Sequence, residues 1–285
     1  MAEAARESQL LTPRGGRLVL HYLLLISVSL VFGVPLVWMV LSSLKPEYQI
    51  FANPPVWLPS PFRWDNYRNA LTILPFATYF LNSVLIALGS IVGHLLSCTI
   101  VAYGFARLRA PGRGFLFLLV LSTLMLPYPV TMVPLFIMFS RLGWVNTFWP
   151  LILPTFFGNA FYIFLLRQFF LQLPAELEDA AVIDGASLIQ ILCWIILPLA
   201  TPALATVAIF TFQASWNDFL GPLIFLQDQS RYTLMLGLSL FKGSFQVNWA
   251  YLMAASVAVV APVVVVFFLA QKAFIEGIAF TGSKL

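Results

Sequence analysis

Four carboxylates within nine consecutive residues form the densest cluster of reactive groups in this sequence. They are Glu176, Glu178, Asp179 and Asp184. Pro174 precedes them and suits the first turn of a helix, because its missing N–H is not needed there. Gly185 follows them and can adopt the left-handed conformation that ends a helix. The pattern predicts a helix of two or three turns whose acidic first turn is favoured by the positive end of the helix dipole.

Small residues in the same stretch indicate what this helix could contact. Ala180 and Ala181 would let another backbone approach closely. They share one helical face with Leu177 and Asp184, at three- and four-residue spacings. Because a single basic residue, Arg167, flanks the stretch, the helix would present a compact acidic surface suited to the groove of a partner protein. A solvated loop helix with ordinary charges fits the same residues, and the residues alone leave both interpretations open.

Patterns that predict catalysis or metal binding are missing from the sequence. The only histidines are His21 and His94, and Cys98 and Cys193 lie in apolar runs that suit small buried side chains. The apolar segments hold no His-x-x-Glu-His motif, aspartate pair or serine–histidine set. The chain also has no Gly-x-x-x-x-Gly-Lys-Ser/Thr phosphate loop. We therefore expect no enzyme activity, no metal, no cofactor and no ATP bound by this chain itself.

The composition requires a lipid environment. Of 285 residues, 61% are hydrophobic and 9% are charged, and the mean hydropathy is +0.93. Soluble domains carry about 25% charged residues, so this chain could not cover a globule of its size with polar surface. Lipid must therefore act as solvent for much of the exterior. The net charge of +4 is spread out and forms no basic stripe, which argues against nucleic-acid binding.

Six segments reach the roughly 20 apolar residues that a transmembrane helix needs. They are residues 18–44, 79–106, 115–139, 149–170, 191–212 and 251–270. Arg14 and Arg17 precede the first segment, as in a signal peptide. The apolar run that follows is longer than a signal core of about 7–15 residues, so we predict a retained span. The expected fold is an all-α polytopic membrane protein of about six transmembrane helices with one short cytoplasmic helix.

Basic residues in the connections predict the orientation of these spans. The short turn with Arg107, Arg109 and Arg113 gives the clearest signal, since short loops obey the positive-inside rule best. With this turn inside, nine Lys and Arg residues are cytoplasmic and six lie outside. Both termini are then cytoplasmic.

The connections complete the predicted organisation of one transmembrane domain, residues 1–285. Its cytoplasmic parts would be an N-terminal tail, 1–17, the acidic loop, 172–190, and a C-terminal tail, 272–285. The outer segment 45–78 is rich in proline and aromatic residues, which suits a packed cap at the membrane interface.

The acidic loop resembles the EAA loop of ABC importer permeases, especially those of the carbohydrate branch. That pattern runs Glu-Ala-Ala, two residues, Asp-Gly-Ala, and then a hydrophobic stretch that ends in Leu-Pro. This chain has Asp179-Ala180-Ala181, Asp184-Gly185-Ala186 and Leu197-Pro198. Asp179 stands where the family has glutamate and is one methylene shorter, and Glu178 lies beside it.

Further motifs extend the resemblance to the maltose-type permease subunit over nearly the whole chain. They are Asn82-Ser83, Ala102-Tyr103-Gly104-Phe105-Ala106-Arg107, Leu142-Gly143-Trp144-Val145-Asn146-Thr147, Trp216-Asn217-Asp218-Phe219 and Arg231-Tyr232-Thr233-Leu234. The tail, residues 274–282, is only loosely similar to the family's ending.

The resemblance implies a permease subunit of an ATP-driven importer in a prokaryotic cell membrane. Its partners would be a second permease subunit that is a different chain, two cytoplasmic ATPase subunits that bind the ATP, and an extracytoplasmic solute-binding protein. The short helix would seat in a cleft of the ATPase and transmit its closure to the spans. The residues that this role assigns to coupling are Glu178, Asp179, Ala180, Ala181, Asp184 and Gly185.

Polar residues on or just past the fifth span are the candidate solute contacts. Gln213, Asn217 and Asp218 lie there, and neutral amides beside Trp216 would suit sugar hydroxyls with the ring offering an apolar face. Intramembrane polar groups are functional candidates because burial without a partner is costly. For an isolated amide or imidazole, bonding between helices is the commoner use. The other residues of this kind are Asn82, His94, Asn159 and Gln168.

An ion-coupled secondary carrier of a small polar solute is the alternative function. It would need a carboxylate buried within a span, and the nearest candidate is Asp218 at an outer end. An intramembrane enzyme ranks below both functions, because the spans contain no catalytic set of residues. ATPase activity that appears only with co-purified partner subunits would separate the importer from these alternatives.

Overall fold

The computed structural model describes residues 15–242 and 248–282, with side chains for 18–242 and 248–271. In these ranges every regular element is a helix. Two compact units are present, and each is described by itself. The first comprises residues 1–70 and 246–257, and the second comprises residues 71–245 and 258–285. The side chains of both predicted terminal tails lie outside the described residues.

Within the described residues, four helical segments are long and apolar enough to cross a membrane without a sharp bend. They are Leu18–Ser43, Phe76–Arg107, Trp149–Phe170 and Trp249–Gln271. Two further segments pass the same test as bent pairs, so the prediction of about six spans is confirmed when each pair counts as one span. The third and fifth spans are the two bent ones.

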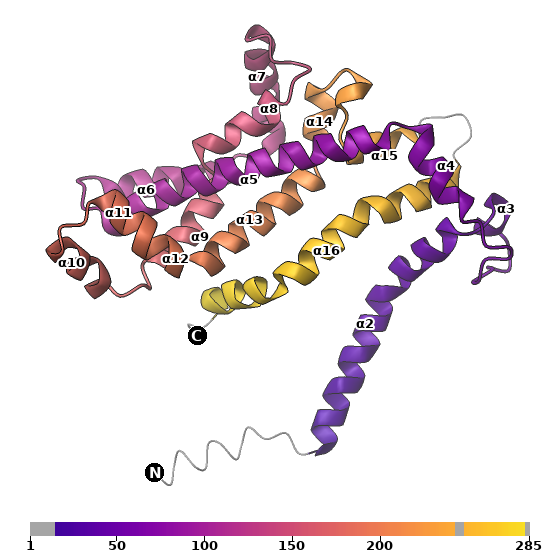
Figure 1. The fold of residues 1–285 in the computed structure, drawn as a ribbon, viewed down its shortest axis with the longest axis horizontal. Coiled ribbons are helices and arrows are strands. Elements are labelled where there is room, and N and C mark those ends of the chain that lie inside the picture. Colours follow the sequence, from indigo (N-terminus) through magenta and orange to yellow (C-terminus); the bar gives the residue numbers. More distant parts are fainter. Residues whose placement is uncertain (1–14, 243–247, 283–285) are drawn as a thin grey trace. The chain divides into compact units, whose positions relative to one another are not determined.

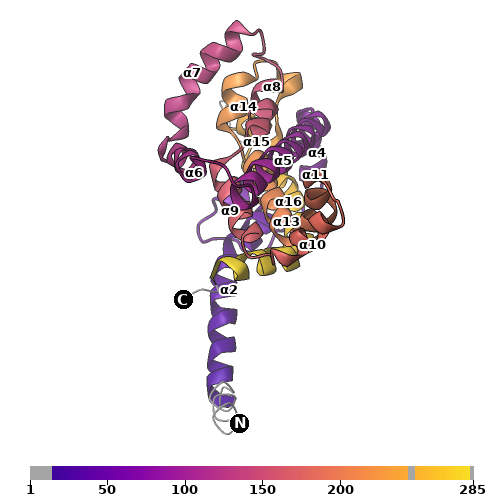
Figure 2. The ribbon, with the colours of Figure 1, turned by 90° about the vertical axis from the view of Figure 1, so that its left-hand side faces the viewer.

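Proline explains both breaks. The third span is α6 (Arg113–Ser122), the turn η1 (Thr123–Met125) and α7 (Tyr128–Arg141), with a bend of 96° at Pro127 (Figure 2). The fifth span bends by 79° between segments Leu188–Leu199 and Thr201–Trp216, where prolines stand on both sides of the break. Proline lacks the N–H that would continue the helical ladder and clashes with the preceding turn.

The first unit contains α2 (Gly15–Ser43), α3 (Glu47–Ile50), most of α4 (Asp65–Ile73) and the first turns of α16 (Trp249–Gly282). The connection between α2 and α4 is held by amide side chains. Asn66 Nδ2 donates to the carbonyl oxygens of Ser43 and Lys45, each at 2.9 Å. The Glu47 carboxylate accepts the backbone N–H groups of residues 249 and 250, both at 2.9 Å, and thereby caps the start of α16. These bonds tie the two ends of segment 45–66 to neighbouring helices, whereas most side chains from 51 to 65 are exposed.

The second unit is built around α5 (Phe76–Arg107), which lies along α9 (Ala160–Phe170) and α13 (Thr201–Trp216) (Figure 1). The remaining elements of this unit before the acidic loop are α8 (Trp149–Ile152) and η2 (Leu153–Phe157). After α13 come α14 (Leu220–Phe225), η4 (Gln229–Arg231) and α15 (Leu234–Leu240).

Small side chains bring the three central helices of this unit together. Cys98 and Ala102 on α5 and Ala203 on α13 are buried, and the larger Leu166 and Phe170 of α9 fill the space beside them. Small residues allow close backbone approach, which is the main source of attraction between helices in lipid. The three helices therefore share one packed core.

Candidate functional site

The acidic loop forms the short helix α10 (Glu176–Ile183), as predicted. Gly185 has a φ of +83°. Two backbone N–H groups that follow the helix donate to carbonyls of its last turn. The Gly185 N–H donates to the carbonyl of Val182 at 3.0 Å, and the Ala186 N–H donates to that of Ala181 at 2.9 Å. This pair of bonds is a Schellman ending, which requires the left-handed conformation that glycine adopts without penalty.

Side-chain exposure divides α10 into an inner and an outer face. Ala181 is buried in the helical core of its unit, and Glu178 is half-buried beside it. Asp179, Ala180 and Asp184 are exposed, as are the apolar side chains Leu177, Val182 and Ile183. Of the predicted common face of Leu177, Ala180, Ala181 and Asp184, Ala181 is buried and the other three residues are exposed. The outer face, defined by Leu177, Asp179, Ala180, Ile183 and Asp184, is both acidic and apolar.

Glu178 does not share the outer face with Asp179. Its Oε1 lies 2.7 Å from Nε of Arg107, at the end of α5, and both side chains are about 15% exposed. The contact is an ion pair without hydrogen-bond alignment, since neither atom has a partner in hydrogen-bonding geometry. Tyr103 Oη donates to Glu178 Oε2 at 3.5 Å. The two adjacent carboxylates thus have different roles: Glu178 holds the helix, and Asp179 faces outward.

Arg107 reaches a second point on the same loop. Its Nη2 donates to the carbonyl oxygen of Leu173 at 2.7 Å, just before Pro174. Sequence reasoning assigned Arg107 to the inner side and missed these contacts. The two partners are far apart in the sequence and no spacing rule connects them, so only the packing of the loop under α5 reveals the pair.

A bent arm connects α10 to α13. It consists of α11 (Leu188–Ile191), the π-helical turn η3 (Leu192–Ile196) and α12 (Leu197–Leu199). Ser187 starts it with a reciprocal cap: the Gln190 N–H donates to Ser187 Oγ, and the Ser187 N–H donates to Gln190 Oε1. The π-helical turn and the bend at Ala200 place two irregular points between α10 and the long helix α13. Such turns often occur at functional sites.

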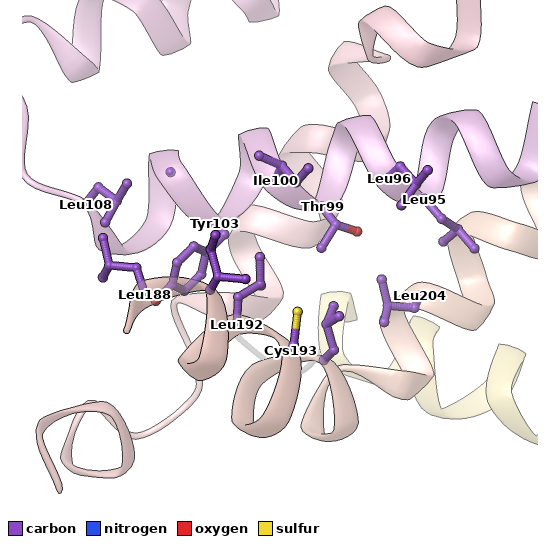
Figure 3. A pocket seen from close by; sticks show the side chains of 13 residues that line it. Leu95, Leu96, Thr99, Ile100, Tyr103, Leu108, Leu188, Leu192, Cys193 and Leu204 are labelled. Carbon is purple, nitrogen blue, oxygen red and sulfur yellow. The ribbon is translucent and has the colours of Figure 1, made fainter. Parts of the chain in front are cut away.

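An apolar groove separates this arm from α5. Its volume is about 590 Å³, and Figure 3 shows leucine, isoleucine and cysteine side chains of the two elements facing each other across it. Tyr103 lines the groove on the α5 side and also contacts α10. The arm and this part of α5 are therefore not in continuous contact.

Exposed amides remain on the candidate solute path. Gln213 and Asn217 are exposed, and Asn217 Nδ2 donates to the Gln213 carbonyl at 2.9 Å. Asp218 is half-buried, and its Oδ1 accepts the Gly221 N–H at 3.0 Å at the start of α14. Burial raises the pKa of the Asp218 carboxyl, while backbone N–H groups of Leu220 and Gly221 act in the opposite direction. Asp218 thus caps a helix.

Trp216 is not available to a solute, contrary to the expectation from the sequence. The side chain is 2% exposed and lies 5.2 Å from the Phe212 ring and 5.8 Å from the Phe80 ring, centroid to centroid. Its Nε1 donates to the Val259 carbonyl at 3.0 Å. A buried indole usually finds such a partner, and this one fixes α13 against α16.

The other polar residues of the spans bond within the protein. Asn82 Nδ2 donates to the carbonyl oxygens of Ser230 and Tyr232, each at 3.0 Å. His94 Nδ1 lies 3.2 Å from Thr211 Oγ1, and Asn159 accepts two backbone N–H groups at the start of α9. The His94 contact joins α5 to α13 and the Asn82 contacts join α5 to the η4 turn, as the helix-bonding interpretation expects, whereas Asn159 caps its own helix. Gln168 is half-buried.

The family model for "Binding-protein-dependent transport system inner membrane component" matches residues 98–279. A probable ABC transporter permease protein, YurM of Bacillus subtilis, is 36% identical over 263 residues, 92% of this chain and 85% of that protein. The arabinooligosaccharides transport system permease protein AraQ of Halalkalibacterium halodurans is 36% identical, and the match covers 93% of this chain and 97% of that protein. The trehalose/maltose transport system permease protein MalG of Thermococcus litoralis is 34% identical, and the match covers 91% of this chain and 96% of that protein.

Among solved structures with a similar fold is the crystal structure of a bacterial ABC transporter involved in the import of the acidic polysaccharide alginate. The TM-score is 0.80 at 24% identity, over 91% of this chain and 98% of that one.

Proposed function

We infer the function from the family: this chain belongs to the binding-protein-dependent transport system inner membrane components, and it is a permease subunit of an ABC importer for a sugar or sugar-like solute. It is a multi-pass protein of a prokaryotic plasma membrane, with a transport role and no enzymatic one. The names of two relatives described above mention arabinooligosaccharides and trehalose with maltose, so we propose a carbohydrate as the solute.

The outer face of α10 is the observation that carries the coupling mechanism. A helix of eight residues is held from inside by Glu178, while Asp179, Ala180 and Asp184 stay exposed. We propose that this face seats in a cleft of a cytoplasmic ATPase subunit. Gly185 ends the helix sharply, so the chain can leave the cleft toward α11. Movement of the ATPase would then reach α13 through the bent arm.

We propose that the remaining machinery is supplied by other chains. It would consist of a second, different permease subunit, two ATPase subunits that bind and hydrolyse ATP, and an extracytoplasmic solute-binding protein. We propose that both termini and α10 lie in the cytoplasm, because the basic turn that follows α5 favours that side. The exposed amides Gln213 and Asn217 are candidate solute contacts in this arrangement.

The ion-coupled carrier has less support. It needs a carboxylate free to exchange an ion within a span, whereas the Asp218 carboxylate accepts a backbone N–H and caps α14. The relatives named above are transport system permeases, which favours the importer.

Co-purification tests this proposal. The permease is isolated in mild detergent with its co-expressed ATPase subunits, and ATP turnover is measured. We expect turnover only when those subunits are present, and Asp179→Lys should release them from the complex. Asp65→Lys is the matched control, because that exposed carboxylate lies on the outer segment. Full retention of the ATPase by Asp179→Lys would exclude the outer face of α10 as its docking site.

A further inference from the structure

We propose that Arg107 is a positioning residue that ties α10 directly to α5, so that a displacement of α10 moves the central helix of the second unit. The inference rests on the proposed docking of α10 to an ATPase. It adds a second route of transmission, separate from the bent arm.

The contacts give one guanidinium two attachment points on the loop. Arg107 Nε lies 2.7 Å from Glu178 Oε1 in the first turn of α10, and Nη2 bonds the Leu173 carbonyl at 2.7 Å before that helix begins. Tyr103, one turn earlier on α5, donates a hydrogen bond from its hydroxyl to the other carboxylate oxygen of Glu178. Because the attachments lie on both sides of Pro174, they fix the direction of α10 as well as its position.

Because both side chains are mostly buried, each charge depends on the other for a partner. Both charged side chains are about 15% exposed, and the paired atoms are shielded from solvent. Removing one partner would leave the other charge partly buried and unpaired, which is the costly situation for an ion pair. Glu178 and Arg107 therefore depend on each other, in contrast to the exposed Asp179 and the exposed Arg109 two residues further on.

The arm is an indirect route from α10 to α5. A π-helical turn and a 79° bend interrupt it. An apolar groove of about 590 Å³ lies between part of the arm and α5 (Figure 3), although Ile191 and Ile196 of the arm are buried in the same core as Tyr103. By contrast, α5 packs tightly against α9 and α13. A pull on the end of α5 through Arg107 would reach both of those helices.

The test uses the complete transporter, with its ATPase and binding protein, in proteoliposomes. The variants are Arg107→Gln and the nearly isosteric Glu178→Gln, and Arg109→Gln is the control with the same loss of charge. Because neither substitution changes the outer face of α10, we expect both variants to keep bound ATPase subunits, and uptake is normalised to the ATP that each variant hydrolyses. Solute uptake per ATP hydrolysed should fall by at least about fivefold, the low end of ordinary coupling between sites. Arg109→Gln should behave as the wild type.

The double variant distinguishes a tie from two independent effects. If the two residues act through each other, Arg107→Gln with Glu178→Gln should be no worse than the more affected single variant. Additive losses, or wild-type uptake per ATP in Glu178→Gln, would overturn the proposal. Failure of docking itself would appear differently, as loss of the ATPase from the complex. The two proposals therefore fail in separate ways.

Discussion

Replacement of Gly185 by valine should uncouple transport without disturbing the spans. The glycine has a φ of +83°, and nothing lies within 4 Å of the place where a Cβ would stand. A valine would therefore meet no steric obstacle from neighbouring residues. Its whole penalty is conformational, since an L-residue in the left-handed region costs about 1–2 kcal/mol.

The chain could escape this cost only by giving up the helix ending. The N–H groups of Gly185 and Ala186 would then lose their bonds to the last turn of α10. At about 1 kcal/mol for each bond, this choice costs about as much as keeping the strained conformation. A penalty of about 1–2 kcal/mol lowers the ratio of the native ending to the alternative ending by about 5–30-fold. If only the native ending fits the ATPase cleft, uptake should fall by up to that factor.

The assay measures expression, ATPase co-purification and uptake on the same preparation. Gly114→Val is the matched control, because Gly114 also has open space around it but no positive φ. Gly185→Asn should retain more uptake than Gly185→Val, since asparagine tolerates the left-handed region better. Full uptake by a well-expressed Gly185→Val protein would refute the assignment of this loop as the coupling element.

Three further predictions follow from the orientation, the solute path and the packing of α13. A single cysteine at Ala175 should be shielded from impermeant reagents in intact cells and one at Asn53 should label, whereas labelling at Ala175 from outside would reverse the orientation. Gln213→Leu and Asn217→Leu should change solute-stimulated ATP turnover more than basal turnover, and normal transport by both would make them packing groups. Trp216→Phe removes a buried hydrogen bond worth about 1–3 kcal/mol, so it should lower the melting temperature of the detergent-solubilised complex and leave solute selectivity unchanged. An unchanged melting temperature or an altered selectivity would contradict that role.

Hydropathy and helix-end signals predicted the spans and the short helix well, because spans and helix ends are set by residues that are close together in the sequence. Apolar runs identified the spans, and Pro174 with Gly185 bracketed a helix that the structure contains at Glu176–Ile183. The prolines near the two broken spans were visible too. A proline limits the helix at its own position, but the size of the bend depends on what the two halves pack against, so bends of 96° and 79° could not be read from the sequence.

Side-chain partners were the part that the sequence could not supply. Glu178 and Asp179 are adjacent carboxylates with the same local signal, yet one faces Arg107 and the other faces outward. Successive residues on a helix point about 100° apart, and which of them turns inward is set by the docking of α10 beneath α5. Trp216 shows the same limit: its position beside two polar residues suggested a solute contact, whereas packing on Phe80 and Val259 buries it.

The most direct test of the account is the energy source of transport by the purified complex. The permease pair, ATPase subunits and solute-binding protein are assembled in proteoliposomes, and uptake of a labelled oligosaccharide is followed. Uptake should require ATP on the side that holds the ATPase and should persist when ionophores collapse proton and sodium gradients. Uptake driven by an ion gradient in liposomes that lack the ATPase would contradict the account and establish a secondary carrier.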